Sequence, residues 1–211
     1  MQIVNKKNVL AALLIVVFGL SRWPGLMPPN FSAAYAMVFC AGLYLPGRLG
    51  WILPLGVLAG SDLLINLVFY AKDGFSTGAF IKAELPVWLA YAGMVALGRA
   101  FGAKRSWWTL VGGGVIGAML FYVVTNTGAW MSLPGYQKTL SGWVQAVTIG
   151  LPGFPQTWEF FRNTLLSGGL FTGLFVGSIK LMETPESADV EEDEESTQEP
   201  EAQPVKGEPQ S

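Results

Sequence analysis

The stretch that decides the fold is residues 51–70, WILPLGVLAGSDLLINLVFY, twenty residues in which Asp62 is the only charged side chain. At a rise of 1.5 Å per residue, an α-helix of this length covers about 30 Å, the thickness of the hydrocarbon core of a bilayer. Trp51 and Tyr70, at its two ends, are residue types that collect at membrane interfaces. The stretch therefore predicts a membrane-spanning helix that carries a carboxylate.

The rest of the chain fits the same class of protein. Half of its residues are hydrophobic, only 13% are charged and 26 are glycine, a composition typical of packed membrane helices. We expect an all-α bundle of about six transmembrane helices near residues 9–20, 31–45, 51–70, 80–100, 107–126 and 157–181. A short amphipathic or re-entrant helix is expected before the last span, at residues 139–149.

Charge is divided unevenly along the chain. Residues 1–182 carry 12 basic and 4 acidic side chains, whereas residues 183–211 carry 1 basic and 11 acidic ones. A segment rich in like charges and poor in apolar residues cannot bury a core. The sequence thus predicts a transmembrane helical domain, residues 1–182, followed by a disordered acidic tail, residues 183–211.

The basic residues also indicate an orientation. Six spans place both termini on one side, together with the pairs Lys6/Lys7 and Lys104/Arg105. Loops rich in lysine and arginine tend to stay in the cytoplasm. We therefore expect a multi-pass protein of the inner (plasma) membrane, in contact with membrane lipid, with both termini cytoplasmic.

Several kinds of chemistry are excluded by what the sequence lacks. It contains no histidine, which removes Ser-His and Cys-His nucleophile pairs and the usual zinc motifs. Cys40 is the only cysteine, so neither an internal disulfide nor a thiolate cluster can form. Asp62 alone is acidic deep in a span, so two aspartates cannot cooperate as in an intramembrane protease. We expect no enzyme activity, no cofactor, no metal site and no nucleic-acid partner.

Glycines recur four residues apart in several spans. Residues 112–117 match the GxGxxG dinucleotide fingerprint, but that motif requires a preceding strand, and here it lies in an apolar helix. Glycines at this spacing let helix backbones approach closely in lipid. We therefore interpret three sets as helix-packing positions: Gly113 and Gly117; Gly56 and Gly60; Gly169, Gly173 and Gly177.

Asp62 and Asn66 are four residues apart, so both point from one face of the third span. One interpretation is the polar wall of a ligand or ion cavity. The other is an interhelical hydrogen bond or an ion pair, with Arg22 or Arg162 as partner. An ionisable group within a membrane costs free energy and usually marks a functional site, but it can also link two helices. The sequence therefore leaves both interpretations open.

Polar residues also gather at the ends of other spans. Arg162 and Asn163 follow Glu159 at helical spacing, which fits either a local ion pair or an arginine that faces an anionic ligand. Asn126 and Trp130 end the fifth span, as pocket residues or as ordinary interface residues. Lys82 and Glu84, two residues apart, are expected on different faces, reaching to the headgroups.

These blocks carry a resemblance. The residues concerned are Arg22-Trp23-Pro24 with Pro28-Pro29-Asn30-Phe31, then Ser61-Asp62-Leu63-Leu64, then Thr125 to Trp130 with Tyr136, Thr139, Leu140 and Gly142, and last Phe161 to Leu165. In this order they resemble a bacterial family of uncharacterised six-helix membrane proteins. That family is similar to the substrate-binding S components of energy-coupling-factor (ECF) vitamin transporters.

The resemblance implies a function and a site. S components bind a small molecule near the outer face and dock on a membrane coupling protein driven by two ATPases. Carried over, the ligand site would comprise Asn30, Asp62, Asn66, Asn126, Trp130, Arg162 and Asn163. One departure concerns docking, because S components often show Ala-x-x-x-Ala on the first helix, whereas Ala11 and Ala12 are adjacent here. The alternative function is a non-transporting structural or assembly protein that interacts through its glycine-rich helices and acidic tail.

Overall fold

Every regular element that the structure describes is helical. The computed structural model describes residues 6–71 and 74–183, and the predicted tail beyond residue 183 lies outside the described residues. The chain divides into two units, Met1–Ser178 and Ile179–Ser211. Only the last residues of one helix belong to the described part of the second unit, so the description below concerns the first.

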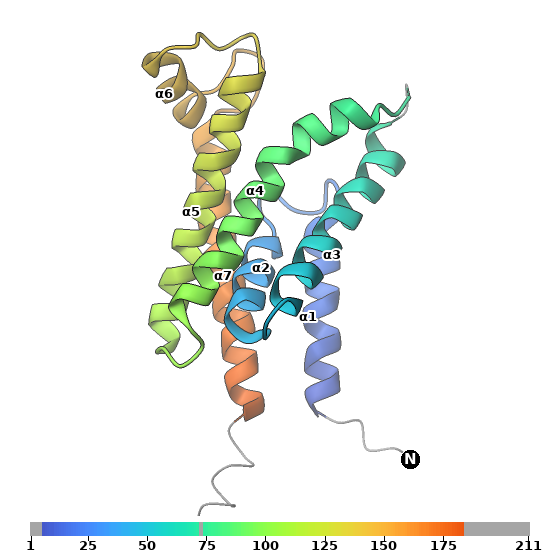
Figure 1. Cartoon of the computed structure of the whole chain (residues 1–211), viewed down its shortest axis with the longest axis vertical. Helices are drawn as coiled ribbons and strands as arrows, with labels where there is room; N and C mark the ends of the chain where they lie inside the picture. The colour runs from blue at the N-terminus through green and yellow to red at the C-terminus, as the bar shows by residue number, and fades with distance from the viewer. Residues whose placement is uncertain (1–5, 72–73, 184–211) are drawn as a thin grey trace, which may run out of the picture. The chain divides into compact units, whose positions relative to one another are not determined.

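The helices follow one another along the chain with short connections (Figure 1). In the described residues these are α1 (Lys6–Arg22), α2 (Ala34–Tyr44), α3 (Leu49–Ile65), the π-helix η1 (Asn66–Tyr70) that continues α3, α4 (Thr77–Phe101), α5 (Trp107–Ser132), α6 (Leu140–Thr148) and α7 (Thr157–Glu183). The all-α prediction is confirmed for this part of the chain.

Four of these helices are long and apolar enough to cross a membrane: Leu49–Tyr70, Thr77–Phe101, Trp107–Ser132 and Thr157–Leu181. By contrast α2 has 11 residues, which at 1.5 Å each is only about 16 Å. The short helix expected at residues 139–149 is present as α6, where the Thr139 side chain caps the Gly142 N–H at 3.2 Å. The count of six spans and a re-entrant course for α6 stay predictions.

Glycines bring α2 against α4. A Cβ on Gly42 would overlap the Val95 carbonyl oxygen, and one on Gly98 would overlap the Phe39 carbonyl oxygen. The two backbones therefore touch at a point where any other residue would force them apart. Neither glycine belongs to the sets singled out from the sequence.

The glycine sets of α5 and α7 are packing positions, as predicted. Gly113 lies against the Phe39 and Phe101 rings, and Gly117 lies against Met94. On α7, Gly173 lies against Trp107, whose indole N–H donates to the Gly173 carbonyl at 3.1 Å. The prediction is wrong for Gly56 and Gly60, which have no neighbouring atom within 4 Å and face outward from α3.

The helix α4 bends within its first half (Figure 1). Pro86 lies inside it, and proline removes one backbone donor and clashes with the preceding turn, which is the usual cause of a sharp kink. On its other side Pro86 touches α5, because a Cβ on Gly128 would meet the proline ring. The bend leads the start of α4 toward the end of α3.

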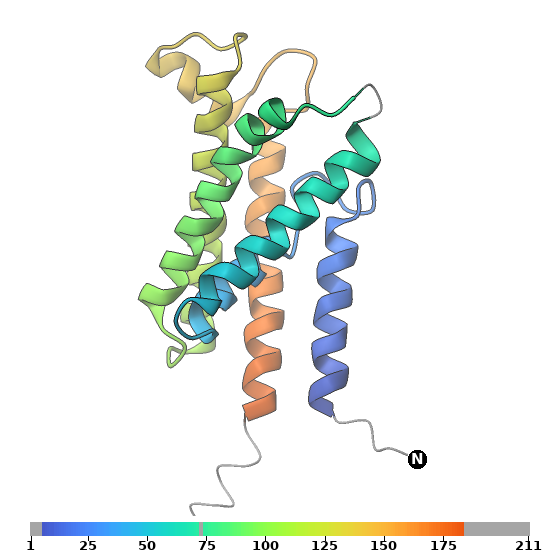
Figure 2. The ribbon, with the colours of Figure 1, turned by 45° about the vertical axis from the view of Figure 1, so that its right-hand side comes forward.

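The connection between α1 and α2, residues 23–33, lies part of the way along the bundle, well short of the end where α6 lies (Figures 1 and 2). Irregular backbone at membrane depth is tolerated only where it is buried in protein or lines a wet cavity. Its polar groups are accordingly satisfied: the Ala33 N–H donates to Ser21 Oγ at 2.9 Å and the Tyr35 hydroxyl donates to the Asn30 carbonyl at 3.2 Å. This connection forms the base of the site described next.

Candidate functional site

A cavity of about 740 Å³ opens above the α1–α2 connection. Its wall combines the end of α1, that connection, the start of α2, the end of α3 with η1, the first half of α4 and one residue of α5. Three residues predicted from the sequence, Asn30, Asp62 and Asn66, line it. The volume falls within the range of about 300–1,000 Å³ that is usual for small-molecule sites.

Arg22 and Asp62 form an ion pair at the wall of this cavity, through Arg22 Nη2 and Asp62 Oδ1. The Asp62 side chain is 7% exposed and that of Arg22 is 19% exposed, so the pair is largely withdrawn from solvent. Of the two partners considered from the sequence, Arg22 is the right one. The pair is a link between α1 and α3 and a part of the cavity wall at the same time.

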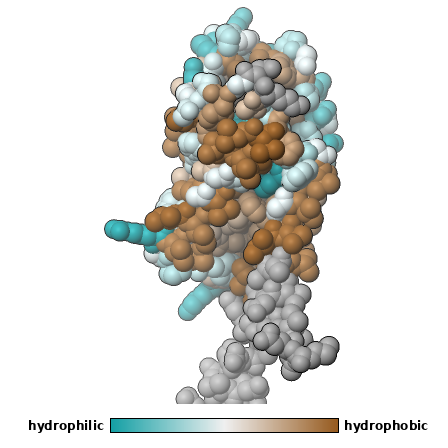
Figure 3. Space-filling model, turned by 90° about the vertical axis from the view of Figure 1, so that its right-hand side faces the viewer, coloured by the Kyte–Doolittle hydropathy of each residue, from teal (hydrophilic) through white to brown (hydrophobic). Residues whose placement is uncertain are grey.

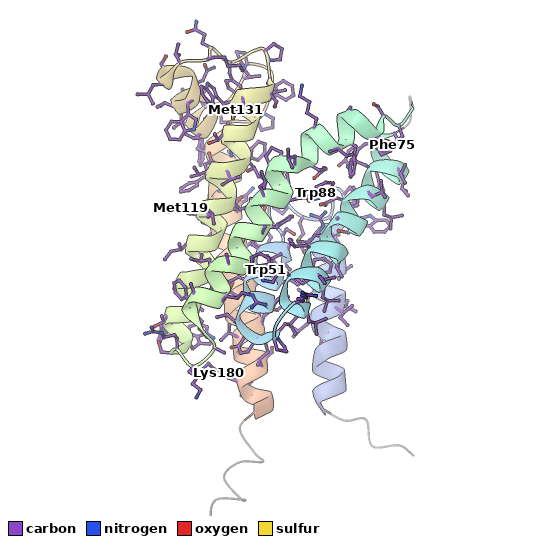
Figure 4. The ribbon with its side chains drawn as sticks, in the orientation of Figure 1. Trp51, Phe75, Trp88, Met119, Met131 and Lys180 are labelled. Carbon is purple, nitrogen blue, oxygen red and sulfur yellow. The ribbon has the colours of Figure 1, made fainter. Side chains whose placement is uncertain are left out.

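The pair is not fully satisfied. Arg22 Nε and Asp62 Oδ2 are buried without a hydrogen bond of standard geometry, and so is Trp88 Nε1. The Trp88 indole nevertheless lies near enough to the Asp62 carboxylate to interact with it. Figure 4 shows Trp88 on the side of α4 that faces α3. Buried polar groups left in this state cost free energy, which is a common feature of functional sites.

Asn66 and Tyr70 extend the wall along η1. Asn66 Nδ2 donates to the Asp62 carbonyl at 3.1 Å, which fixes the amide against its own helix. The Ala71 N–H donates to the Asn66 carbonyl at 2.8 Å, five residues back, and this bond defines the π-turn. Single π-turns occur often at functional sites, and this one lies at the mouth of the cavity.

Glu84 is the cavity residue that sequence reasoning missed. It lines the cavity from α4, close enough to Asp62 and Arg22 to feel both charges, and next to the Asn66 side chain. The expectation that it reaches to the headgroups is therefore wrong, while Lys82 does point to another face, toward α5. The available signal was spacing, because Glu84, Val87 and Tyr91 share one helix face.

Aromatic rings are the next feature of the cavity wall. Six of them line the cavity: Trp23, Phe31, Tyr35, Tyr70, Tyr91 and Phe121. Phe121 packs with ring centroids 4.8 Å from Tyr35 and 5.0 Å from Tyr91, which holds these rings in place. The cavity thus combines a few charged groups with rigid rings.

Asn126 and Trp130 do not reach this cavity. Asn126 Nδ2 donates to the Tyr122 carbonyl at 2.8 Å and lines a separate cavity of about 420 Å³ near the α5–α6 connection. Trp130 Nε1 donates to the Gln137 carbonyl at 2.8 Å, which ties the end of α5 to the following loop. Both residues belong to the α6 end of the bundle, and their joint assignment with Asp62 is wrong.

Arg162 and Asn163 have different roles. Arg162 is exposed, lies over the Trp158 ring at 5.4 Å from its centroid and makes no ion pair with Glu159. Asn163 is buried and donates from Nδ2 to the Pro29 carbonyl at 3.0 Å. Asn163 therefore supports the base of the cavity from α7, whereas Arg162 is not part of the cavity wall.

The acidic groups of the cavity are Asp62 and Glu84. Within residues 6–71 and 74–183 no three histidine, cysteine or acidic side chains come together. What the cavity can do is bind a molecule by charge, hydrogen bonds and ring stacking.

The outer surface of the helices also indicates the class of protein. Large apolar side chains point outward along the helices, among them Ile52 and Leu64 of α3, Val68 of η1 and Leu170 of α7. Figure 3 shows broad hydrophobic areas on one face, with hydrophilic residues between them. Four membrane-length helices with an apolar exterior and a polar cavity inside define an integral membrane protein of the helical class.

The chain belongs to a family of unknown function, DUF6580, whose model matches residues 2–190. This match supports the expectation of an uncharacterised membrane protein family. No curated protein and no solved structure matches the chain.

Proposed function

We propose that this protein is a small-molecule binding and uptake subunit similar to an ECF transporter S component, with its ligand in the cavity beside Arg22 and Asp62. The observation that carries the proposal is the cavity itself: charged, amide and aromatic side chains from α1, α2, α3 and α4 converge on a space of ligand size. Charges inside a membrane protein are retained where they serve a substrate or ion path.

The orientation proposed for the chain gives this cavity a direction. With cytoplasmic termini and six spans, α1 and α3 both end toward the outer side and α4 begins there. The cavity, built from those ends, would then receive ligand from outside the cell. The family resemblance implies the same location, near the outer face and under connecting loops.

Energy for uptake must come from elsewhere. The sequence contains no ATP-binding P-loop, so the proposal includes a membrane coupling protein and ATPases as partners, besides the surrounding lipid. No catalytic role is proposed. The absence of an Ala-x-x-x-Ala face on α1 means that docking would use another surface.

The test is a search for bound ligand by native mass spectrometry on protein purified in nanodiscs. Asn66→Ala removes a cavity group whose amide donates to its own helix, so the packing between helices does not depend on that bond. Asn126→Ala is the matched control, since its amide makes the same bond four residues back and lies in another cavity. We expect a small molecule to co-purify with the wild-type protein. Its occupancy should fall by about tenfold in Asn66→Ala and stay unchanged in Asn126→Ala.

Two results would contradict the proposal. One is wild-type protein without any bound small molecule from a native membrane extract. The other is equal occupancy in wild type and Asn66→Ala, with both variants folded by size-exclusion chromatography. Co-purification of a coupling protein with ATPases would support the transporter assignment, and its absence together with an empty cavity would favour a structural or assembly protein.

A further inference from the structure

We propose that the ligand of this cavity is a small organic cation, a molecule with one positively charged nitrogen on a body that stacks against aromatic rings. This inference rests on the proposed binding function and adds the chemical class of the ligand. It follows from the charges, the unsatisfied carboxylate and the rings that meet in the cavity.

The described side chains that line the cavity carry one positive and two negative charges. Arg22 and Asp62 neutralise each other in their ion pair. Glu84 is left over: it makes no ion pair within the described residues, and the nearest basic residue along its helix, Lys82, faces α5. A carboxylate partly withdrawn from water, which shares Arg22 with Asp62 and has no ion-pair partner of its own, is poorly compensated, so the cavity attracts a cation.

The second observation is the state of Asp62. This side chain lines the cavity, is 6% exposed as a residue, and leaves Oδ2 without a hydrogen bond of standard geometry. The Trp88 indole lies near enough to this carboxylate to interact with it. Two carboxylates therefore face the same space, Asp62 with one oxygen unsatisfied and Glu84 without an ion pair among the described residues. An anionic ligand would meet both of them, and like charges in such surroundings repel strongly.

The rings indicate that the cation is organic. Trp23, Tyr70 and Phe31 stand near the mouth and base of the cavity, and Tyr35 and Tyr91 form its inner wall. Aromatic faces attract organic ammonium groups through the ring quadrupole and bury their apolar substituents. A bare inorganic cation would gain nothing from these rings, whereas an organic cation can use the carboxylates and the rings together.

The experiment measures binding of four probes to wild-type protein in nanodiscs by isothermal titration calorimetry at neutral pH. Tryptamine and trimethylphenylammonium are organic cations, 3-methylindole is a neutral molecule of the same ring type, and indole-3-acetate is the corresponding anion. Sodium and potassium chloride form a separate arm. We expect at least one of the organic cations to bind and the neutral and anionic probes to bind at least about tenfold more weakly.

Variants then test the residue that carries the surplus charge. Glu84→Gln should weaken cation binding by about tenfold or more, and Glu84→Asp should restore most of it. Glu159→Gln is the matched control, because it removes a carboxylate that does not line the cavity. Size-exclusion chromatography checks that each variant is folded.

The inference is overturned if neither organic cation binds, if the neutral or anionic probe binds as tightly, if only sodium or potassium binds, or if Glu84→Gln leaves cation binding unchanged. A neutral or anionic molecule found in purified protein would also overturn it while leaving the proposed binding function intact. If the purified protein carries no small molecule and binds none of the probes, both the inferred ligand class and the proposed binding function are contradicted.

Discussion

Asp62 and Arg22 depend on each other in the folded protein. Each is withdrawn from water, and each would be a lone charge inside the bundle without the other. Removing one partner of a buried pair costs more than removing both, because the remaining charge loses its only compensation. The unequal cost makes the pair testable by a double-mutant cycle.

We expect Asp62→Leu and Arg22→Met to lower the free energy of unfolding by about 3 kcal/mol each. The double variant Arg22→Met with Asp62→Leu should lose less than either single change, since no charge is then left unpaired. Thermal and denaturant unfolding in detergent micelles, followed by tryptophan fluorescence, measures these differences. Additive losses would mean that the two side chains do not interact.

At this scale the sequence predicted some residues well and others poorly. Asp62 could be found because a charge in an apolar run is expensive, and Arg22 was already one of two candidate partners. For Glu84 the spacing with Val87 and Tyr91 was the only signal, and it shows a shared helix face without showing what that face meets. The bend of α4 at Pro86 brings this face to the cavity, and its direction could not be predicted from the sequence.

Among the elements, α5 and α7 are held together where a glycine meets a buried hydroxyl. A Cβ on Gly114 would overlap the Thr172 side chain, which is fully buried. Gly112, two residues earlier, has no neighbouring atom within 4 Å. The two glycines share one helix and one motif but have opposite surroundings.

Gly114→Ala should therefore destabilise the protein by about 1–3 kcal/mol, because the added methyl group forces the two helices apart. Gly112→Ala should leave stability unchanged or raise it slightly, since alanine is the better helix former. The melting temperatures of the two purified variants, each compared with wild type, measure this difference in stability. Equal effects at the two positions would show that the α5–α7 contact is looser than described.

Helix positions were more predictable than helix lengths. The long apolar runs predicted α3, α4, α5 and α7 directly, and the glycine spacing of α5 and α7 predicted packing positions without saying which helices would meet there. The sequence predicts a short second span over residues 31–45, but α2 begins only at Ala34. Residues 31–33 are apolar or small yet belong to an inward loop, where Ser21 and Ser32 accept backbone hydrogen bonds. Local composition does not report where a loop finds its hydrogen-bond partners.

For the whole molecule, the orientation in the membrane is the next quantity to measure. Cys40 is the only cysteine of the sequence and it is buried. The substitution Cys40→Ala therefore gives a background without any cysteine. In it, Ser141→Cys on α6 and Lys104→Cys in the α4–α5 connection place single exposed thiols on opposite sides of the proposed six-span topology.

We expect a membrane-impermeant maleimide to label Ser141→Cys in intact cells and Lys104→Cys only after lysis. The physical reason is the retention of the Lys104/Arg105 loop in the cytoplasm. The opposite pattern would invert the topology and direct the cavity to the cytoplasm. Equal labelling of both sites in intact cells would contradict a span between them.

The π-turn at Asn66–Tyr70 determines where the Tyr70 side chain lies at the cavity. Tyr70 is carried there by the bond from Ala71 to Asn66, a backbone register one residue wider than that of α3. In the ordinary register the same five residues would wind further around the axis and Tyr70 would point elsewhere. The position of Tyr70 at the cavity thus depends on backbone hydrogen bonds of the wider π register, among them the one from Ala71 to Asn66.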